Sequence, residues 1–313
     1  MRVLVAGATG AIGRPLLPML TEAGHEVVGT TRTPGNLDAI ARTGAEPVVM
    51  DALDADAVMR AVVDAKPDAI IHQLSALKEM RDFKRLDKEF AMTNRLRVEG
   101  TNNLLAAARA AGAKRFIAQS FTGPPNPRTG GPVKTEDDGL DPDPVPASRQ
   151  TVDAIRHVEQ VVPAETSLVG IVLRYGAFYG AGTGISRNGD MVEMVRKRKF
   201  PVVGKGTGFW SLIHIDDAAR ATVQALDHGT PGLYNIVDDD PAPVSAVLPA
   251  LAGALGAKPP RHVPAWLAKL FVGDYGISVM TQIRGSSNAK AKRELDWQLR
   301  YPTWREGFRT GLG

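Results

Sequence analysis

The chain has 313 residues, a hydrophobic content of 43% and a formal net charge of +4 at pH 7. It contains no cysteine, which excludes disulfides, thiolate metal sites and a cysteine nucleophile. Its longest apolar runs are strand-sized and fall short of the ~18 residues of a membrane helix, so we expect no membrane partner. A strand predicted from Arg2 leaves no room for a signal peptide, which favours a cytoplasmic protein.

The densest cluster of positive charge is the basic run at residues 196–199. It follows a helix predicted from Asp190 onward, where cations complement the helix dipole and face solvent. No aromatic side chains are interleaved with it, as they are in segments that bind nucleic acid. We therefore expect no nucleic-acid partner.

The first predicted strand, residues 3–6, ends in three regularly spaced glycines and then enters a helical pattern. Gly7 permits a tight turn, Gly10 lets backbone N–H groups approach a pyrophosphate, and Gly13 lets helix and strand pack closely. A second strand closes the βαβ unit, so the pattern predicts a dinucleotide site at the positive end of the helix. The predicted contacts there are Gly7, Thr9, Gly10, Ala11, Ile12, Gly13 and Arg14.

Strand and helix patterns alternate through the first two-thirds of the chain, which predicts an α/β fold of the Rossmann type, a doubly wound parallel sheet wrapped by helices. A helix is predicted over residues 90–111, with Gly112 as its C-cap. The segment 121–146, rich in Pro, Gly and Asp, is interpreted as an active-site loop. The predicted strands are residues 3–6, 26–31, 46–49, 69–73, 115–119, 170–175 and 232–237.

The same alternation suggests two parts. Residues 1–180 form the dinucleotide-binding domain, and residues 210–240 return to its sheet. Residues 181–313, where the pattern loosens, mainly supply a smaller C-terminal lobe that binds a small-molecule substrate.

The end of the second strand favours NADP over NAD. An NAD enzyme places a carboxylate there for the ribose 2′-OH, whereas this chain has Arg32, whose planar fork suits a phosphate. Arg14 offers a second cation, and Asp51 is expected to accept from the adenine amino group. The remaining predicted cofactor contacts are Ala52, Leu53, Leu74, Ser75, Ala76, Asn94, Tyr175 and Phe178.

Together these motifs resemble an extended or atypical short-chain dehydrogenase/reductase of the NAD-dependent epimerase/dehydratase superfamily. The resemblance covers nearly the whole chain and implies hydride transfer between a bound dinucleotide and a substrate held by the C-terminal lobe. It depends on Gly7, Gly10 and Gly13, on Asp51, on Asn94 with residues 99–105, on residues 115–117, on Arg174 with residues 179–180, and on residues 214–219, 234–236, 288–297 and 301–302.

The resemblance also implies a catalytic Tyr-x-x-x-Lys pair, in which lysine lowers the pKa of the tyrosine, and a Ser or Thr that polarises the substrate. No tyrosine of this chain is followed four residues later by lysine. Counting back from Glu159 puts Thr151 at the tyrosine position and Ile155 at the lysine position. Thr151 and Ser120 are therefore the candidate catalytic residues, and Thr151 has no side-chain pKa suited to proton transfer.

Two further positions bear on the substrate. Nucleotide-sugar relatives hold a diphosphate with an arginine four residues before the His of the His214–Asp217 motif, where this chain has Trp210. Tryptophan in place of arginine removes the cation that would bind a phosphate and offers apolar contact instead. Packing of the lobe explains Trp210 equally well. Arg284 lies near the position where relatives keep another positively charged residue that binds the substrate. A cation there is compatible with an acidic group on the ligand.

The leading hypothesis is an oxidoreductase of the atypical short-chain type that binds NADP and acts on a small, largely apolar metabolite. One alternative is a non-catalytic NADP-sensing regulatory protein. Another is a nucleotide-sugar epimerase or dehydratase with displaced catalytic groups. Relatives often dimerise through paired helices, and the Ala-rich helix 103–111 suits such a homodimer or packing on its own sheet.

Overall fold

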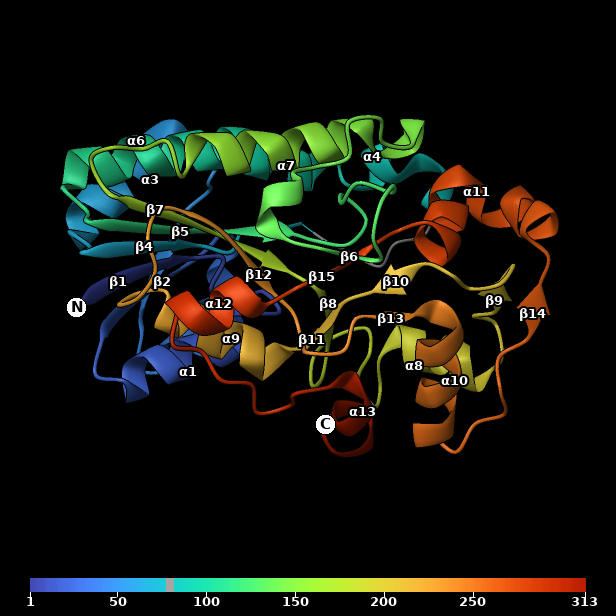
Figure 1. Ribbon diagram of the computed structural model, residues 1–313. Helices are drawn as coiled ribbons and strands as arrows, with labels where there is room; N and C mark the ends of the chain where they lie inside the picture. Colours follow the sequence, from blue (N-terminus) through green and yellow to red (C-terminus); the bar gives the residue numbers. More distant parts are fainter. Residues whose placement is uncertain (77–81) are drawn as a thin grey trace.

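The computed structural model describes residues 1–76 and 82–313 and contains a parallel sheet of seven strands between two layers of helices (Figure 1). The strand order is β12-β7-β5-β4-β1-β2-β3. The chain runs outward from the centre to β3, then crosses back to β4, so the order reverses between β1 and β4, where dinucleotides bind in such sheets. The strands are β1 (Arg2–Ala6), β2 (Glu26–Thr31), β3 (Glu46–Val49), β4 (Ala69–His72), β5 (Arg115–Phe121), β7 (Val169–Tyr175) and β12 (Gly232–Ile236). This confirms the predicted fold class.

The two faces of the sheet bury different side chains because successive residues of a strand point to opposite sides. In β1, Val3 and Val5 join one core and Leu4 the other. The first face is covered by α1 (Gly13–Glu22), α9 (Ile215–Gln224) and α12 (Ala289–Glu294), and the second by α3 (Ala55–Ala65), α6 (Thr101–Ala111) and α7 (Arg149–Val161) (Figure 1). Ala107 and Ala108 of α6 are buried against this protein's own sheet.

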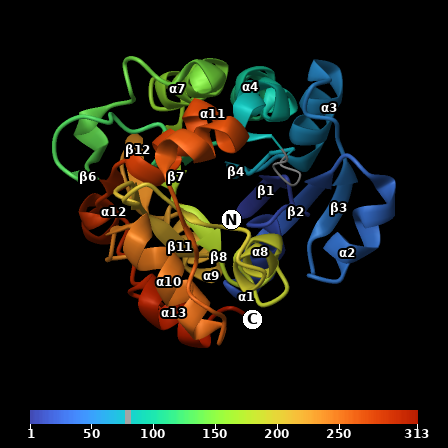
Figure 2. The ribbon, with the colours of Figure 1, turned by 90° about the vertical axis from the view of Figure 1, so that its right-hand side faces the viewer.

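A second lobe is formed by segments before and after β12 and packs around its own hydrophobic core (Figure 2). Short strand pairs join its loops, and four helices enclose the core. The strands are β8 (Ala177–Tyr179), β9 (Val202–Val203), β10 (Phe209–Trp210), β11 (Leu212–His214), β13 (Ala242–Pro243) and β14 (His262–Val263), and the helices are α8 (Asp190–Arg196), α10 (Val244–Ala254), α11 (Ala265–Thr281) and α13 (Trp304–Thr310). The remaining α-helices and strands are α2 (Leu37–Ala41), α4 (Leu86–Glu89), α5 (Ala91–Arg95), β6 (Val133–Lys134) and β15 (Gly285–Ser286).

Part of the C-terminal segment packs under the sheet. Ala291, Leu295 and Trp297 belong to the core under the sheet, not to that of the second lobe. The indole of Trp297 donates to the carbonyl of Asp217 at 3.1 Å, which fixes this segment to α9. The chain therefore returns to the sheet a second time after residue 240.

The predicted helix 90–111 is present but interrupted. A π-helical turn over Leu96–Gly100 separates α5 from α6, and such turns occur often at functional sites. Gly112 ends α6 in the left-handed conformation with φ 72°, as predicted for a C-cap glycine.

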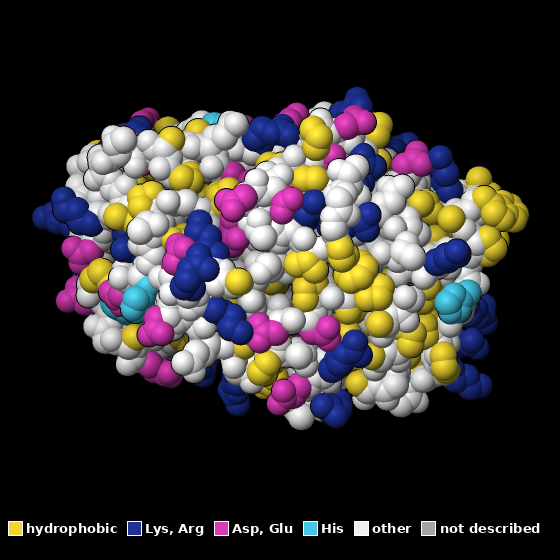
Figure 3. Space-filling view, viewed as in Figure 1, with side chains coloured by type: hydrophobic (Ala, Val, Ile, Leu, Met, Phe, Trp, Pro, Cys, Tyr) yellow, Lys and Arg dark blue, Asp and Glu magenta, His cyan; other side chains and the backbone are white. Residues whose placement is uncertain are grey.

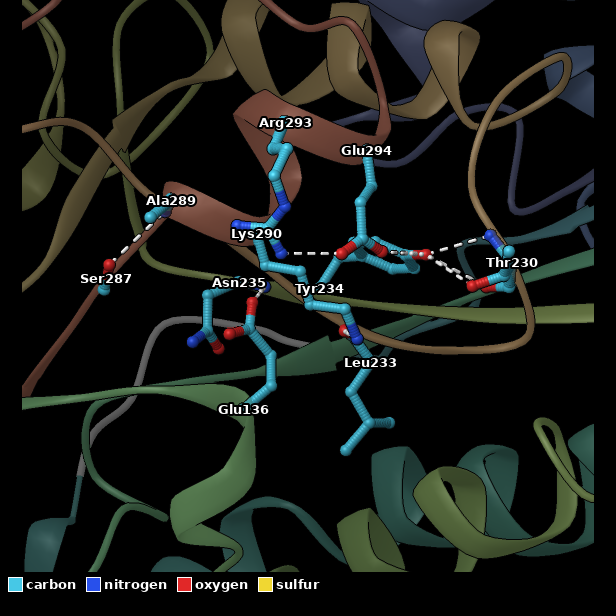
Figure 4. Close-up of polar contacts among 10 residues, drawn as sticks. All are labelled: Glu136, Thr230, Leu233, Tyr234, Asn235, Ser287, Ala289, Lys290, Arg293 and Glu294. Atoms are coloured by element: carbon cyan, nitrogen blue, oxygen red, sulfur yellow. Dashed lines mark hydrogen bonds and ion pairs between the residues drawn. The ribbon is translucent and has the colours of Figure 1, made fainter.

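The outer strand β12 has its exposed edge covered by charged side chains (Figure 4). The backbone N–H of Asn235 donates to Glu136 Oε1 at 2.7 Å, and the carbonyl of Leu233 accepts from Lys290 Nζ at 3.0 Å. The Lys290 ammonium also lies 4.5 Å from the ring centroid of Tyr234. These contacts satisfy edge groups that would otherwise be free to pair with another strand.

Three large apolar side chains on α11 are exposed, at the right of Figure 3: Trp266, Leu270 and Phe271. No helix within residues 1–76 or 82–313 is both long and apolar enough to cross a membrane.

Candidate cofactor and substrate site

The glycine bend after β1 is shaped so that side chains are excluded from it. Gly7 has φ 96°, and a Cβ atom there would lie 2.6 Å from the carbonyl oxygen of Gln73. A Cβ on Gly13 would lie 2.4 Å from the carbonyl oxygen of Ala8, whereas one on Gly10 would come no closer than 3.2 Å to a backbone oxygen, that of Gly7. Gly7 and Gly13 are thus required by the fold, and Gly10 leaves its space for a ligand. The residues present fit a pyrophosphate.

The start of α1 has the electrostatics that an anion needs. No side chain caps its N-terminus, and its first turn has no acidic residue. The free amide groups and the positive end of the helix dipole therefore remain available for phosphate oxygens.

Three charged residues lie where the adenine and its ribose are expected to bind. Arg32 is exposed, and no hydrogen bond or ion pair joins its side chain to residues 1–76 or 82–313. Arg14 is also exposed and donates from Nε to the carbonyl of Thr9 at 3.2 Å. Asp51 follows β3 and accepts from the N–H of Leu53 at 3.0 Å, so one carboxylate oxygen forms a turn and the other has no partner among the described residues.

The loop after β4 adjoins this bend. A Cβ on Gly100 would lie 3.8 Å from atoms of both Ala52 and Leu74, so these two residues pack against the same glycine. The carbonyl of Leu74 accepts from Gln119 Nε2 at 2.6 Å, and the N–H of Ala76 donates to Thr93 Oγ1 at 3.1 Å. Ser75 between them is exposed. The structure thus places the predicted contacts of the third and fourth strands together.

The side chain of Tyr175, a predicted cofactor contact, lies in the core. Its hydroxyl lies 2.7 Å from Thr222 Oγ1 and accepts from Gln73 Nε2 at 2.9 Å. Burial raises the pKa of Tyr175 to about 12. Phe178 is partly exposed and packs on the Tyr175 ring, with 5.5 Å between centroids. Of these two aromatic side chains, only that of Phe178 reaches the surface.

Thr151, at the usual tyrosine position, is buried and fully hydrogen-bonded. Its hydroxyl donates to Asp87 Oδ1 at 2.7 Å and accepts from Asn94 Nδ2 at 3.1 Å. The Asp87 carboxylate also accepts from the N–H groups of Gln150 and Thr151, at 3.0 and 2.9 Å. Asp87 therefore caps the N-terminus of α7 from another helix, and Thr151 closes that cap. Ile155, at the lysine position, is a core residue.

Ser120 is engaged in a comparable way. Its hydroxyl donates to Glu159 Oε1 at 2.7 Å, and the same carboxylate is paired with the buried Arg174. Ser120 and Arg174 are neighbours in the β5–β7 register, so this polar row crosses the sheet beneath α7.

Sequence analysis missed Arg97, which lies in the π-helical turn. It is buried, and within the described residues its Nη1 donates a hydrogen bond to Asn94 Oδ1 at 3.1 Å. Burial lowers the pKa of Arg97 to about 10. Asn94, predicted as a cofactor contact, thus links Arg97 to Thr151. The π-helical turn itself has no sequence signal that we recognised.

The two predicted substrate residues differ in placement. Trp210 is buried in the core of the second lobe, and its indole N–H donates to the carbonyl of Val279 at 3.1 Å, so packing accounts for it. Arg284 is half-buried, and its buried Nε atom has no hydrogen-bond partner among the described residues. Its carbonyl accepts from Asn126 Nδ2 at 3.1 Å, in a network that includes Thr122 and Ser286. The predicted loop 121–146 therefore adjoins Arg284.

The profile of the NAD dependent epimerase/dehydratase family matches residues 3–237, and the chain belongs to this family. One relative is the 3-diazoavenalumate denitrifying reductase of a Streptomyces species. It is 44% identical over 309 residues, which cover 98% of this chain and 99% of the relative.

Two solved structures share the fold. UDP-glucose 4-epimerase of Thermus thermophilus in complex with NAD has a TM-score of 0.75 at 22% identity, covering 100% of this chain and 98% of that chain. A human epimerase family protein with NADPH has a TM-score of 0.75 at 21% identity, covering 100% and 99%. Family and fold support a nicotinamide dinucleotide as the cofactor class.

Proposed function

We propose that this protein is an NADPH-dependent reductase that reduces a small, largely apolar organic acid without the Tyr-Lys pair. The observation that supports this most strongly is the contrast between two parts of one site. The glycine bend is intact, whereas the hydroxyl at the tyrosine position is occupied by Asp87 and Asn94. A reduced nicotinamide, when bound, supplies hydride.

NADP rather than NAD is supported by Arg32. Its exposed guanidinium follows β2, where a carboxylate would repel a 2′-phosphate, and no described residue pairs with it. A free guanidinium forms two charge-assisted hydrogen bonds with a phosphate. Arg14 adds a second positive charge near the same bend.

An anionic group on the substrate is supported by Arg284. Its buried Nε–H group, which no described residue accepts from, has lost its hydration and gains from a carboxylate oxygen. The Streptomyces relative is named for a diazo compound in its anionic form, which agrees with such a contact.

A diazo acid is therefore the first substrate class to test. Hydride that replaces the diazonium group leaves a C–H bond and releases dinitrogen with the bonding electrons of the C–N bond. This exchange requires no tyrosine that protonates a keto oxygen. That agrees with a chain whose tyrosine position holds a hydrogen-bonded threonine, Thr151, and whose lysine position holds a core residue, Ile155.

The experiment is to follow the nicotinamide absorbance of NADPH with a panel of aromatic diazo acids, ketones, enones and imines. We expect oxidation of NADPH with at least one panel member, and faster oxidation with acids than with their methyl esters. NADPH that binds tightly but is not oxidised by any member would contradict the proposal and favour the sensing protein. Interconversion of UDP-sugars without net oxidation would favour the epimerase.

A further inference from the structure

The first half of α11, before the kink at Gly273, carries large apolar side chains on its outward side. Trp266, Leu270 and Phe271 are 72%, 63% and 73% exposed, and their helical spacing places them on one side of the helix. The opposite side packs into the second lobe through Ala268. A surface helix of a globular protein has polar residues on its outer side, so this helix is unusual. We call the three exposed residues the apolar face.

Positive charge gathers around the start of the same helix. Residues 194–205 and 258–273 contain eight lysines and arginines and no aspartate or glutamate. The two segments are neighbours, because β9 and β14 pair in parallel and Arg198 Nε donates to the carbonyl of Pro259 at 3.0 Å. The basic run at 196–199 therefore belongs to the same end of the molecule as α11.

Four of these cations are exposed and lie close to the apolar face in the chain or in space. Lys258 and Arg261 come just before α11, and Lys205 follows Gly204, whose Cβ would lie 3.7 Å from Cβ of Ala265. Lysine and arginine side chains lie directly below the apolar face at the right of Figure 3. We call these four residues the basic surface: Lys199, Lys205, Lys258 and Arg261.

An apolar tip beside a group of cations has the chemistry that binds an anionic lipid bilayer. Aromatic rings and leucine enter the boundary between headgroups and acyl chains, while lysine and arginine are attracted by the negative lipids. A protein partner fits less well, because three side chains fall short of the ~800 Å² that each partner buries in a standard interface. A nucleic acid fits less well too, because the aromatic rings are not interleaved with the cations.

We infer that this end of the second lobe binds the surface of an anionic lipid bilayer. The apolar face enters the interface, and the basic surface contacts the headgroups. The expectation of no membrane partner came from apolar runs too short to span a bilayer, and a contact with one leaflet needs no spanning helix. The inference is independent of the proposed function, since it involves neither the glycine bend nor Arg284.

The test uses the full chain with vesicles of phosphatidylglycerol and phosphatidylcholine, and pure phosphatidylcholine vesicles for comparison. We expect cosedimentation with the anionic vesicles, weakened about 10-fold or more by salt that screens the basic surface. Trp266 is exposed, whereas the other three tryptophans are buried, so its emission should shift to shorter wavelength on binding. Lipids brominated on their acyl chains should quench it.

The apolar face is tested by the double variant Leu270→Ser, Phe271→Ser. Because both side chains lose their burial in lipid, vesicle affinity should fall about 10-fold or more. Val63→Ser, at an exposed position of α3, is the matched control and should bind as the wild type does.

The basic surface is tested by the double variant Lys258→Gln, Arg261→Gln. Each cation near an anionic surface contributes about a factor of five, so affinity should fall about 10-fold or more. Arg60→Gln, an exposed cation of α3, is the matched control. All substituted positions are exposed, and circular dichroism verifies that each variant folds.

No cosedimentation of the wild type with anionic vesicles would overturn the inference. Equal affinity of the wild type and the Leu270→Ser, Phe271→Ser variant would overturn it as well, as would equal binding to charged and neutral vesicles. Dimerisation that this variant abolishes, in a protein that does not bind vesicles, would replace the bilayer by a second copy of the chain. Binding of an oligonucleotide without binding of vesicles would assign the basic surface to a nucleic acid instead.

Discussion

Arg174 and Glu159 form a bidentate ion pair beneath α7, with Nη2–Oε2 at 2.6 Å and Nε–Oε1 at 2.8 Å. Only 2% and 5% of their side-chain surfaces are exposed. Ser120 donates to the same carboxylate, so one acidic side chain joins α7 to two adjacent strands. The pair fixes the helix whose first turn contains Thr151.

Removal of one partner should therefore be costly. Glu159→Gln leaves the Arg174 cation buried without a counter-charge and should reduce the free energy of unfolding by about 3 kcal/mol. Urea denaturation followed by circular dichroism measures this. Glu193→Gln breaks an exposed pair with Lys197 and should change stability little. Equal effects of the two substitutions would show that the buried pair is not a major contribution.

A substitution in the glycine bend can separate the effect on NADPH binding from the effect on stability. Gly10→Ala should leave the melting temperature within a few degrees of wild type, because its Cβ meets one backbone oxygen at 3.2 Å. The same methyl group occupies the space for the pyrophosphate, so NADPH affinity should fall about 10-fold or more. Calorimetric titration measures the affinity, and Gly253→Ala, whose Cβ meets nothing within 4 Å, is the control. Unchanged NADPH affinity in Gly10→Ala would place the nucleotide elsewhere.

Arg32 determines the choice of cofactor in this account. Arg32→Asp should weaken NADPH binding about 10- to 100-fold, the effect of losing charge-assisted hydrogen bonds to a phosphate, and should strengthen NADH binding. The ratio of the two dissociation constants is the measurement. Arg60→Asp, at an exposed position of α3, should not change the ratio. The same ratio in Arg32→Asp and wild type would argue against NADP.

His72 predicts a dependence of stability on pH. Burial lowers its pKa from 6.5 to about 4, and its Nδ1 accepts from the N–H of Leu74. The unfolded chain therefore binds a proton that the folded chain does not, between about pH 6.5 and pH 4. Stability should fall by up to about 3 kcal/mol as the pH decreases through this window.

The contribution of His72 is isolated by comparison with His72→Gln, which has no titrating ring. Urea midpoints of both proteins at several pH values give the difference between their slopes. The wild type should lose more stability than the variant below about pH 6.5. Parallel curves would mean that His72 is not the group responsible.

Much of the fold follows from local signals in the sequence. The glycines at 7, 10 and 13 and the alternation of apolar runs predict β1, α1 and the parallel sheet, because each signal is contained in a short segment. The ends of neighbouring parallel strands meet at one edge, so the pairing of β2 and β3, which precede Arg32 and Asp51, was also predictable.

The interior of the site was less predictable. Asp87 reaches the start of α7 from a position 64 residues before Thr151, and no local pattern encodes such a contact. The π-helical turn that holds Arg97 is likewise invisible to a 3.6-residue period. Trp210 was ambiguous because an indole suits either a ligand or a core, and its contact with Val279, 69 residues later, has no local signal.

The most direct test of the account is hydride transfer itself. NADPH deuterated at the transferable position of C4 is incubated with the protein and a substrate from the panel, and the product is analysed by mass spectrometry. We predict one deuterium in each product molecule, and one NADP⁺ formed for each. Tight binding of NADPH with no deuterium in any product would contradict a reductase.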